Sequence, residues 1–343
     1  MVKLMTIIQN YNNFDWRKYM DYYPDLKKAP SINNKQSAWK HWVMHGMKEQ
    51  RQFFAVNTER SYLRQDFFED NYTIYITRHM NNEETSKYWK HNYECLRRIY
   101  KKVKIVVIDD NSHESFTMGD KEVSDVTFFY SNKENKDNKF GCKEFTKRGE
   151  MLPFYYFHTY GKTKYAVFLH DSVFIQHHIH DNMFEDDFLS FWSFNSVSWY
   201  VQLRDAMNKC ISKFEKSREL ENVWKNLNCW QGTFGGICIV SRDYVDELEK
   251  DYKFISIGLK EVDSRDKRML LERLLSIFYF HKHDRSPHTL FADIHIWSRG
   301  TFGKSWGLKW DEYRRNPRLK KAQVVKIWSG RGMLLPGEEI GLR

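Results

Sequence analysis

An apolar segment broken by three polar residues constrains the fold of this chain more than any other feature. Residues 165–175 read Tyr-Ala-Val-Phe-Leu-His-Asp-Ser-Val-Phe-Ile, which predicts a buried strand interrupted by His170, Asp171 and Ser172. An ionised carboxylate inside a strand is costly unless it is paired or binds a cation. We therefore expect Asp171 just beyond the carboxyl end of the strand, where open α/β sheets bind ligands. There it could hold a divalent cation and a diphosphate, or it could cap the strand and begin a turn.

Two further strands and a helix are predicted upstream of this segment. Residues 72–79 and 104–109 are short runs rich in β-branched residues, and residues 83–100 between them place apolar side chains at helical spacing. A right-handed crossover makes two such strands parallel, and continuous apolar runs suit parallel strands that are covered on both faces. The second strand ends in Asp109 and Asp110, which could receive the ribose or base of a nucleotide or could form a turn.

Composition limits the classes of protein to which the chain can belong. Its 343 residues are 41% hydrophobic and 17% aromatic, enough for one large domain and one small one. The 55 lysines and arginines outnumber the 45 acidic residues, and the net charge of +10 suits an anionic ligand. Because the basic residues are spread along the chain and the aromatic residues follow apolar patterns, we expect no nucleic acid partner.

Cysteine spacing and hydropathy bear on the compartment. The five cysteines have no zinc-binding spacing, which predicts free thiols in a reducing compartment. The apolar stretch at the N-terminus is too short for a signal peptide, and the chain has no run of about 18 apolar residues. We therefore expect no membrane span and a cytoplasmic protein, or a fragment of a longer one.

Four segments, in the same order over roughly residues 70–300, resemble GT-A glycosyltransferases. Residues 105–112 resemble the nucleotide-binding strand of that family, and residues 168–173 resemble its metal-binding strand. Residues 230–240 resemble its glycine-bearing acceptor segment, and residues 271–273 resemble its acid-containing helix start. The chain departs from the family at the metal-binding strand. There two acids normally flank one residue, and this chain has the single acid Asp171.

The resemblance implies an α/β fold, with a GT-A-like, mostly parallel sheet and helices on both faces, over residues 61–343. It implies transfer of a sugar, expected to be a hexose, from a nucleotide-diphosphate sugar to a hydroxyl of a glycan or protein acceptor, assisted by Mn²⁺ or Mg²⁺. Glu272 would be the catalytic residue that removes the acceptor's proton, and Asp171 and His295 would hold the metal. The residues expected to bind the nucleotide sugar are Thr77, Asp109, Asp110, Arg148, His170, Trp230 and Gly235.

The residues around Glu272 support two interpretations. A helix is predicted over residues 263–280, and it is expected to expose four basic side chains to water: Arg265, Lys267, Arg268 and Arg273. The apolar neighbours of Glu272 on this helix would raise its pKa, as suits a general base. An ion pair with Arg268 or Arg273 would explain the glutamate equally well.

Three other features could contact the substrates. Arg148 precedes a helix predicted from Gly149 to Tyr160, whose start could face a phosphate or could be a solvated basic loop. Trp230 could form a wall for an acceptor sugar. A glycine-rich stretch over residues 300–307 could close over a diphosphate with the help of Arg299, Lys304 and Trp306.

The first 60 residues are expected to form a separate helical module. Within residues 13–54, two helical patterns are broken at Pro24 and closed by Gly46. They resemble a small module found beside glycosyltransferase domains in large DNA viruses and some microbes. Packing or protein contact is its expected role, and a linker is predicted over residues 55–66.

A second hypothesis comes from another functional class. The chain could be a non-catalytic α/β protein that binds a nucleotide or a glycan and has lost the second acid of the metal-binding strand. The single acid at Asp171 favours it. Binding of nucleotide sugars with and without Mn²⁺ would distinguish the two hypotheses.

Overall fold

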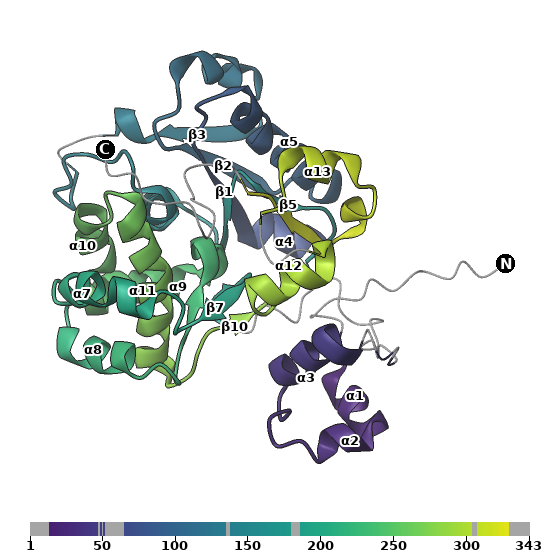
Figure 1. Cartoon of the computed structure of the whole chain (residues 1–343). Coiled ribbons are helices and arrows are strands. Elements are labelled where there is room, and N and C mark those ends of the chain that lie inside the picture. The colour runs from purple at the N-terminus through teal and green to yellow at the C-terminus, as the bar shows by residue number, and fades with distance from the viewer. Residues whose placement is uncertain are drawn as a thin grey trace.

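The computed structural model describes residues 14–46, 49, 51, 65–134, 138–179, 186–303 and 307–328, with the backbone alone over residues 65–67. Its main part is an α/β fold around a seven-stranded sheet in the order β10-β6-β9-β4-β1-β2-β3 (Figure 1). Neighbouring strands are parallel throughout except at β9, which is antiparallel to both β4 and β6. The mostly parallel sheet predicted from the sequence is confirmed. Its strands are β1 (Tyr72–Arg78), β2 (Lys104–Asp109), β3 (Val126–Tyr130), β4 (Tyr165–His170), β6 (Phe188–Ser190), β9 (Cys238–Ser241) and β10 (His288–Thr289).

The predicted strand–helix–strand unit is formed by β1, α5 (Glu83–Ile99) and β2. The side chain of Asn82 caps α5 by accepting the backbone N–H of Thr85 at 2.8 Å. The two strands are parallel, and Arg78 at the end of β1 lies opposite Asp109 at the end of β2. This register brings the polar residues that follow both strands to the same edge of the sheet.

Alternate residues of the central strands form two cores, one on each face of the sheet. Tyr75 and Phe168 pack into one core with residues of six helices, whereas Ile74 and Val167 pack into the other with residues of α5 and α12 (Ile294–Phe302). Helices therefore cover both faces, as predicted (Figure 1). The six helices of the first layer are α6 (Leu152–Tyr160), α7 (Tyr200–Ile211), α8 (Ser217–Lys225), α9 (Arg242–Tyr252), α10 (Phe254–Glu261) and α11 (Arg265–His283).

The segment predicted as one interrupted strand is two strands. β4 ends at His170, and after a turn at Asp171 and Ser172 the chain enters β5 (Val173–Ile175), which belongs to a different sheet. There β5 pairs antiparallel with β11 (Val324–Lys326) from the C-terminal part of the chain. Asp171 thus lies directly after the carboxyl end of β4, which is parallel to β1. The chain leaves the large sheet at this point, so the carboxylate of Asp171 does not lie inside a strand.

Short elements complete the described structure. A second small sheet pairs β7 (Ser193–Asn195) with β8 (Gln231–Thr233). The remaining α-helices and short helices are α4 (Gln65–Asn71), α13 (Trp310–Arg315), η3 (Glu114–Phe116), η4 (Met118–Glu122), η5 (Ser131–Lys133), η6 (Gly149–Met151), η8 (Phe234–Gly236) and η9 (Leu319–Lys321). Within the described ranges, no helix combines the length and the apolar character needed to cross a bilayer.

Helix α11 confirms the predicted helix over residues 263–280 but corrects one of its side chains. Leu270, Leu274 and Phe278 are buried as expected. Arg273 is not exposed to water, since it is only 2% accessible. Its guanidinium donates hydrogen bonds of 2.7 Å to the carbonyl oxygens of Met269 and Ser198. Arginine can be buried in this way because backbone carbonyls accept its N–H groups.

The N-terminal helices form a small aromatic core of their own. They are α1 (Trp16–Tyr22), α2 (Pro24–Lys27), α3 (Lys35–His41) and the π-helical turn η1 (Trp42–Gly46). Their core also includes Ala292 of the main part, and the Gln36 amide donates to Gln231 at 3.0 Å. Figure 1 shows these helices below α12. The division at residue 60 stays a prediction, and residues 55–64 of the predicted linker lie outside the described ranges.

Candidate active site

Polar residues gather where β1, β2 and β4 end side by side. Asp171 donates its backbone N–H to the Thr77 carbonyl at 2.9 Å. The backbone N–H of His79 donates to Asp171 Oδ2 at 3.4 Å, and the ring Nδ1 of His79 lies 2.8 Å from the carbonyl oxygen of Asp110. His79 therefore bridges the two acids that the sequence places after β2 and β4.

A chain of alternating charges starts at Asp110 and crosses this edge. Asp110 Oδ2 lies 3.9 Å from the Arg268 guanidinium, which in turn lies 3.3 Å from Glu150 Oε2. The other oxygen of Glu150 lies 3.3 Å from His170 Nε2. We call Asp110, Glu150, His170, Arg268 and Glu272 the carboxyl-edge network, because all five lie at or beside the carboxyl ends of these strands.

Glu272 joins the carboxyl-edge network through Gly235. The backbone N–H of Gly235 donates to Glu272 Oε1 at 3.0 Å. Gly235 has a φ of +64°, and a Cβ atom there would lie 3.0 Å from His170 Cε1. Glycine is required because this turn brings the backbone against the His170 ring with a positive φ. The glycine-bearing segment and the acid-containing helix start, both predicted as site segments, thus meet at one point.

The two glutamates of the carboxyl-edge network have opposite pKa shifts. Burial, followed by the negative charge of Glu150, raises the pKa of Glu272 to about 8. Burial also acts to raise the pKa of Glu150, but the ion pair with His170 and the charge of Arg268 outweigh it and hold that pKa at about 2. Environments that separate two carboxyl groups in this way are typical of acid–base chemistry.

Three polar atoms at this edge have no hydrogen bond of good geometry among the described residues. They are buried, and they are Thr77 Oγ1, Glu150 Oε2 and His170 Nε2. Glu150 Oε2 and His170 Nε2 keep the ion-pair contacts given above, so Thr77 Oγ1 is the atom of the three that is left for a polar ligand. Thr77, a predicted site residue, lies opposite His170 in the register of β1 and β4.

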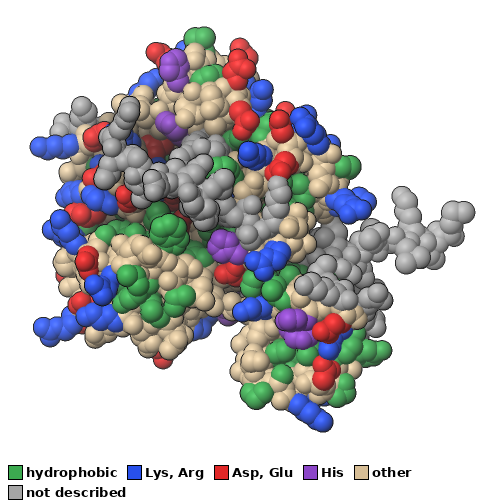
Figure 2. Space-filling model, viewed as in Figure 1, with side chains coloured by type: hydrophobic (Ala, Val, Ile, Leu, Met, Phe, Trp, Pro, Cys, Tyr) green, Lys and Arg blue, Asp and Glu red, His purple; other side chains and the backbone are tan. Residues whose placement is uncertain are grey.

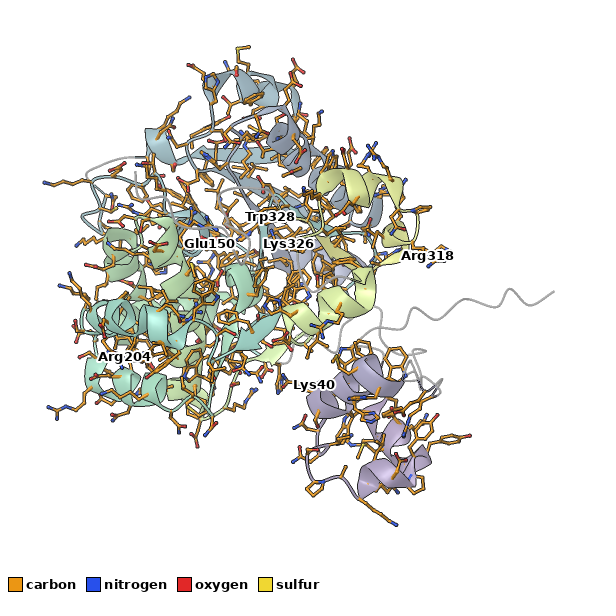
Figure 3. All side chains as sticks on the ribbon, viewed as in Figure 1. Lys40, Glu150, Arg204, Arg318, Lys326 and Trp328 are labelled. Carbon is orange, nitrogen blue, oxygen red and sulfur yellow. The ribbon has the colours of Figure 1, made fainter. Side chains whose placement is uncertain are left out.

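Lys326 brings a positive charge to the same edge from the C-terminal part of the chain. Its ammonium nitrogen lies 2.5 Å from Ser172 Oγ, next to Asp171 in the sequence. The pairing of β11 with β5 places it, because Lys326 lies opposite Val173. Figure 3 draws Glu150, Lys326 and Trp328 in the central part of the molecule, whereas Arg318 lies at its edge.

Asp109, which was predicted to bind the nucleotide, is engaged in a buried ion pair. Its Oδ2 lies 2.7 Å from the Arg78 Nε, and its Oδ1 accepts the backbone N–H of Ser112 at 2.8 Å. Arg78 also pairs with Asp120 and lies over the ring of Trp89. Both oxygens of this carboxylate thus have a partner inside the protein.

The predicted phosphate-facing helix start is occupied by Asp110 instead. The backbone N–H groups of Lys147 and Gly149 donate to the Asp110 carboxylate at 2.6 and 2.9 Å. Burial raises the pKa of Asp110. Arg148 points elsewhere, since its Nε donates to the Leu259 carbonyl at 2.6 Å. These contacts oppose the prediction of a phosphate site at Arg148, because the carboxylate already satisfies the exposed N–H groups.

Trp230 lies in the core, and His295 lies on the surface of α12. Trp230 is 1% accessible and packs against Trp224 in the core, so its ring cannot form the wall of an acceptor site in this conformation. His295 is exposed in the first turn of α12, where its backbone N–H donates to Asp293 at 2.9 Å. Lys304 and Trp306 lie outside the described residues.

The described residues supply one carboxylate for the predicted Mn²⁺ or Mg²⁺. Mg²⁺ is usually bound through one or two carboxylates together with substrate phosphates, and it keeps several waters. Asp171 directly follows β4, where it could be such a ligand, and within the described ranges no three His, Cys, Asp or Glu side chains gather as a metal site. The prediction that Asp171 and His295 hold a metal stays a prediction.

Sequence reasoning missed Glu150, His79 and Lys326 as site residues and treated Arg268 only as a solvated side chain or ion-pair partner. Glu150 follows Lys147, Arg148 and Gly149. The two basic residues favoured the prediction of a phosphate site at this helix start, and Glu150 was not considered. Lys326 lies in a short β-branched run, Val-Val-Lys-Ile, which could have been read as a strand. No local pattern indicates that this strand ends beside Ser172.

Comparison with known proteins gives distant structural likenesses. No protein-family model matches the chain, and no curated protein sequence matches it. A crystal structure of the galactosyltransferase LgtC with donor and acceptor sugar analogs is 9% identical, with a TM-score of 0.34 over 59% of this chain and 70% of that one. An active-site mutant of LgtC is also 9% identical, with a TM-score of 0.31 over 58% of this chain and 70% of that one. Likeness at this level carries no information on ligands or reaction.

Proposed function

We propose that this protein is a glycosyltransferase, which moves a sugar from a nucleotide-diphosphate sugar to a hydroxyl of a glycan or protein acceptor. The observation that carries the proposal is the carboxyl-edge network. It joins Glu150 and Glu272, with opposite pKa shifts, to a glycine turn beside the ends of three parallel strands. Ligands of open α/β sheets bind in this position.

The donor would lie over the ends of β1, β2 and β4. Lys326 beside Ser172 and Arg268 between Asp110 and Glu150 are the cations that would face its diphosphate. Hydrogen bonds between such cations and phosphate oxygens are strong because both partners are charged. Thr77 Oγ1, which is buried without a hydrogen bond to any described residue, would contact a polar group of the donor.

For an inverting transfer, Glu272 is the general base. It takes the proton of the acceptor hydroxyl as that oxygen forms a bond to the anomeric carbon of the sugar. The bond between this carbon and the diphosphate oxygen breaks, and its electron pair leaves with the nucleoside diphosphate. Lys326 and Arg268 offset the charge of the leaving group, which is where electrostatic stabilisation acts. A pKa of about 8 for Glu272 is close to that of an efficient base near neutral pH.

Asp171 would hold the Mn²⁺ or Mg²⁺ together with the diphosphate of the donor, since such a cation is usually bound through one or two carboxylates and substrate phosphates. The metal would add positive charge at the leaving group to that of Lys326 and Arg268.

The second candidate is a binding protein without transferase activity. One observation favours it, namely that the carboxylates of Asp109 and Asp110 are both committed to internal hydrogen bonds. A protein that only binds would bind the nucleotide sugar but would release neither nucleoside diphosphate nor a glycosylated product.

Titration calorimetry with a panel of nucleotide-diphosphate sugars tests the proposal, with a single-stranded oligonucleotide as a negative control. Release of nucleoside diphosphate in the presence of an acceptor mixture measures turnover. Glu272→Gln should keep donor affinity within about threefold and lower turnover by about 100-fold or more. Lys326→Ala should weaken donor binding by about tenfold, which corresponds to ~1.4 kcal/mol. Lys40→Ala, on the exposed side of α3, is the matched control (Figure 3).

The same measurements with a chelator and with Mn²⁺ test the metal: turnover that is lost with the chelator and restored by Mn²⁺ would support a cation held by Asp171 and the diphosphate, and equal turnover would oppose it. Failure of every nucleotide sugar to bind would reject the proposal. Binding without turnover in any acceptor mixture would favour the binding protein.

A further inference from the structure

A groove of about 710 Å³ lies between α5 and the C-terminal segments of the chain. No residue of the carboxyl-edge network lines it. Its walls come from the second half of α5, from the residues after β5, and from α13 and η9. The lining residues are His91, Tyr93, Glu94, Arg97, Arg98, Gln176, His177, Tyr313, Arg314 and Lys320.

The groove contains more positive charge than its surroundings neutralise. Of its four lysines and arginines, Arg97 is paired with Asp125 at 2.6 Å. Arg98, Arg314 and Lys320 are exposed and form no ion pair with any described residue. Glu94, the acid of the lining, lies 3.8 Å from His91 Nδ1 and keeps 69% of its side chain exposed.

Two of these arginines come from different elements, and Arg98 also donates a hydrogen bond of 3.0 Å to Cys95 Sγ. Arg98 lies one turn from Glu94 on α5, and Arg314 is on α13 with its guanidinium 5.5 Å from the Trp310 ring centre. The Nε2 of His91 lies 2.8 Å from the Tyr313 hydroxyl. Burial lowers the pKa of His91, and the charges of Arg314 and Arg98 lower it further against the opposing effect of Glu94. The charges of two guanidinium groups from different elements thus act on one imidazole.

Cations that gather without counter-charges raise the free energy of the folded protein, and a bound anion lowers it. The groove volume lies within the range of about 300–1,000 Å³ that is typical of small-molecule sites. Guanidinium groups offer paired N–H donors that match phosphate oxygens. The Nε2 of His177, also in the lining, is buried without a hydrogen bond to any described residue.

We propose that this groove binds a small ligand with two or more linked phosphate groups, at a site separate from the carboxyl-edge network. The proposal does not depend on the transferase function. A long nucleic acid is disfavoured, because lysines and arginines on the face in Figure 2 are dispersed and alternate with acidic side chains. A compact polyphosphate matches Arg98, Arg314 and Lys320, which line the same groove.

Titration with inorganic tripolyphosphate at constant ionic strength tests the proposal. The double variant Arg98→Ala, Arg314→Ala should lower the affinity by about tenfold or more, because two charge-assisted contacts are lost. The single variant Lys320→Glu should weaken binding as well, which provides a second test. Arg204→Ala is the matched control, since Arg204 is an exposed arginine on α7 that is paired with Asp205 at 3.3 Å.

Lys326→Ala separates this groove from the carboxyl-edge network. Tripolyphosphate binding that persists in Lys326→Ala and is lost in the double variant supports the proposal, whatever the outcome of the nucleotide-sugar titrations. Three results would overturn it: no saturable binding, binding that disappears in Lys326→Ala but not in the double variant, or an equal loss in Arg204→Ala. Circular dichroism of each variant would verify its fold.

Discussion

The backbone N–H of Gly235 donates a hydrogen bond of 3.0 Å to Oε1 of Glu272. One partner lies in a turn with positive φ and the other on the second turn of α11, so two segments 37 positions apart hold each other in place. The bond is compatible with both protonation states of the glutamate. It fixes the carboxyl group beside His170 and Glu150, where its ionisation responds to their charges.

The stability of the protein should depend on pH through Glu272. Its pKa is raised from 4.5 to about 8, so between these values the folded protein keeps a proton that the unfolded chain has released. The free energy of unfolding therefore falls as pH rises through this window, by at most ~1.36 kcal/mol per pH unit for this group. Glu272→Gln should remove this pH-dependent contribution. The free energy of unfolding of the variant, relative to that of the wild type, should therefore increase from pH 5 to pH 8. Urea unfolding at four pH values measures it, with exposed Glu219→Gln as the control. A constant difference between variant and wild type would contradict the argument.

The pH dependence of turnover should respond to Glu150. The negative charge of Glu150 is the second cause of the raised pKa of Glu272, after burial. Glu150→Gln removes this repulsion, so the rising limb of the pH–rate profile should move to lower pH. The expected displacement is one pH unit for every ~1.36 kcal/mol of repulsion removed. The profile of kcat against pH checks it, and a limb that stays in place would assign the titration to another group.

Gly235→Ala should destabilise the protein more than a matched glycine substitution. The positive φ of +64° costs an alanine about 1–2 kcal/mol. Its Cβ would also lie 3.0 Å from both His170 Cε1 and Ile237 Cδ1. Gly303→Ala is the control, because Gly303 has a φ of +74° but no described atom within 4 Å of the added Cβ. Thermal unfolding should show the larger loss for Gly235→Ala, together with loss of turnover. Equal losses of stability in Gly235→Ala and Gly303→Ala would mean that the contact between the added Cβ and His170 does not destabilise the protein.

Asp109→Asn should lower stability and leave donor binding unchanged. The variant loses the charge of a buried ion pair with Arg78 at 2.7 Å. Charge-assisted hydrogen bonds of this kind contribute about 1.5–3 kcal/mol. Urea unfolding measures the loss, and calorimetry with the donor measures affinity. A stable variant that no longer binds the donor would show that Asp109 contacts the nucleotide, as the sequence predicts.

Some residues of the candidate site could be predicted from the sequence, whereas the environment of others could not. Asp171 was predicted from the apolar run that it interrupts, and Gly235 and Glu272 were predicted from segments that resemble those of GT-A glycosyltransferases. Arg148, Arg273 and Trp230 lie in segments that were also singled out in the sequence, yet their side chains are buried. Long side chains of this type bury their apolar parts and hydrogen-bond to carbonyls such as those of Leu259, Met269 and Ser198, and periodicity does not reveal such partners.

The sequence by itself determined the parallel strands, the helices on both faces and the position of Asp171 after a strand, because local spacing of apolar residues controls which surfaces can be buried. Tertiary structure alone decided that Glu150 lies between His170 and Arg268 and that Lys326 lies beside Ser172, 154 positions earlier. Charges interact over a few ångströms in space regardless of separation along the chain. The pKa values of the two glutamates therefore follow from packing that no local pattern contains.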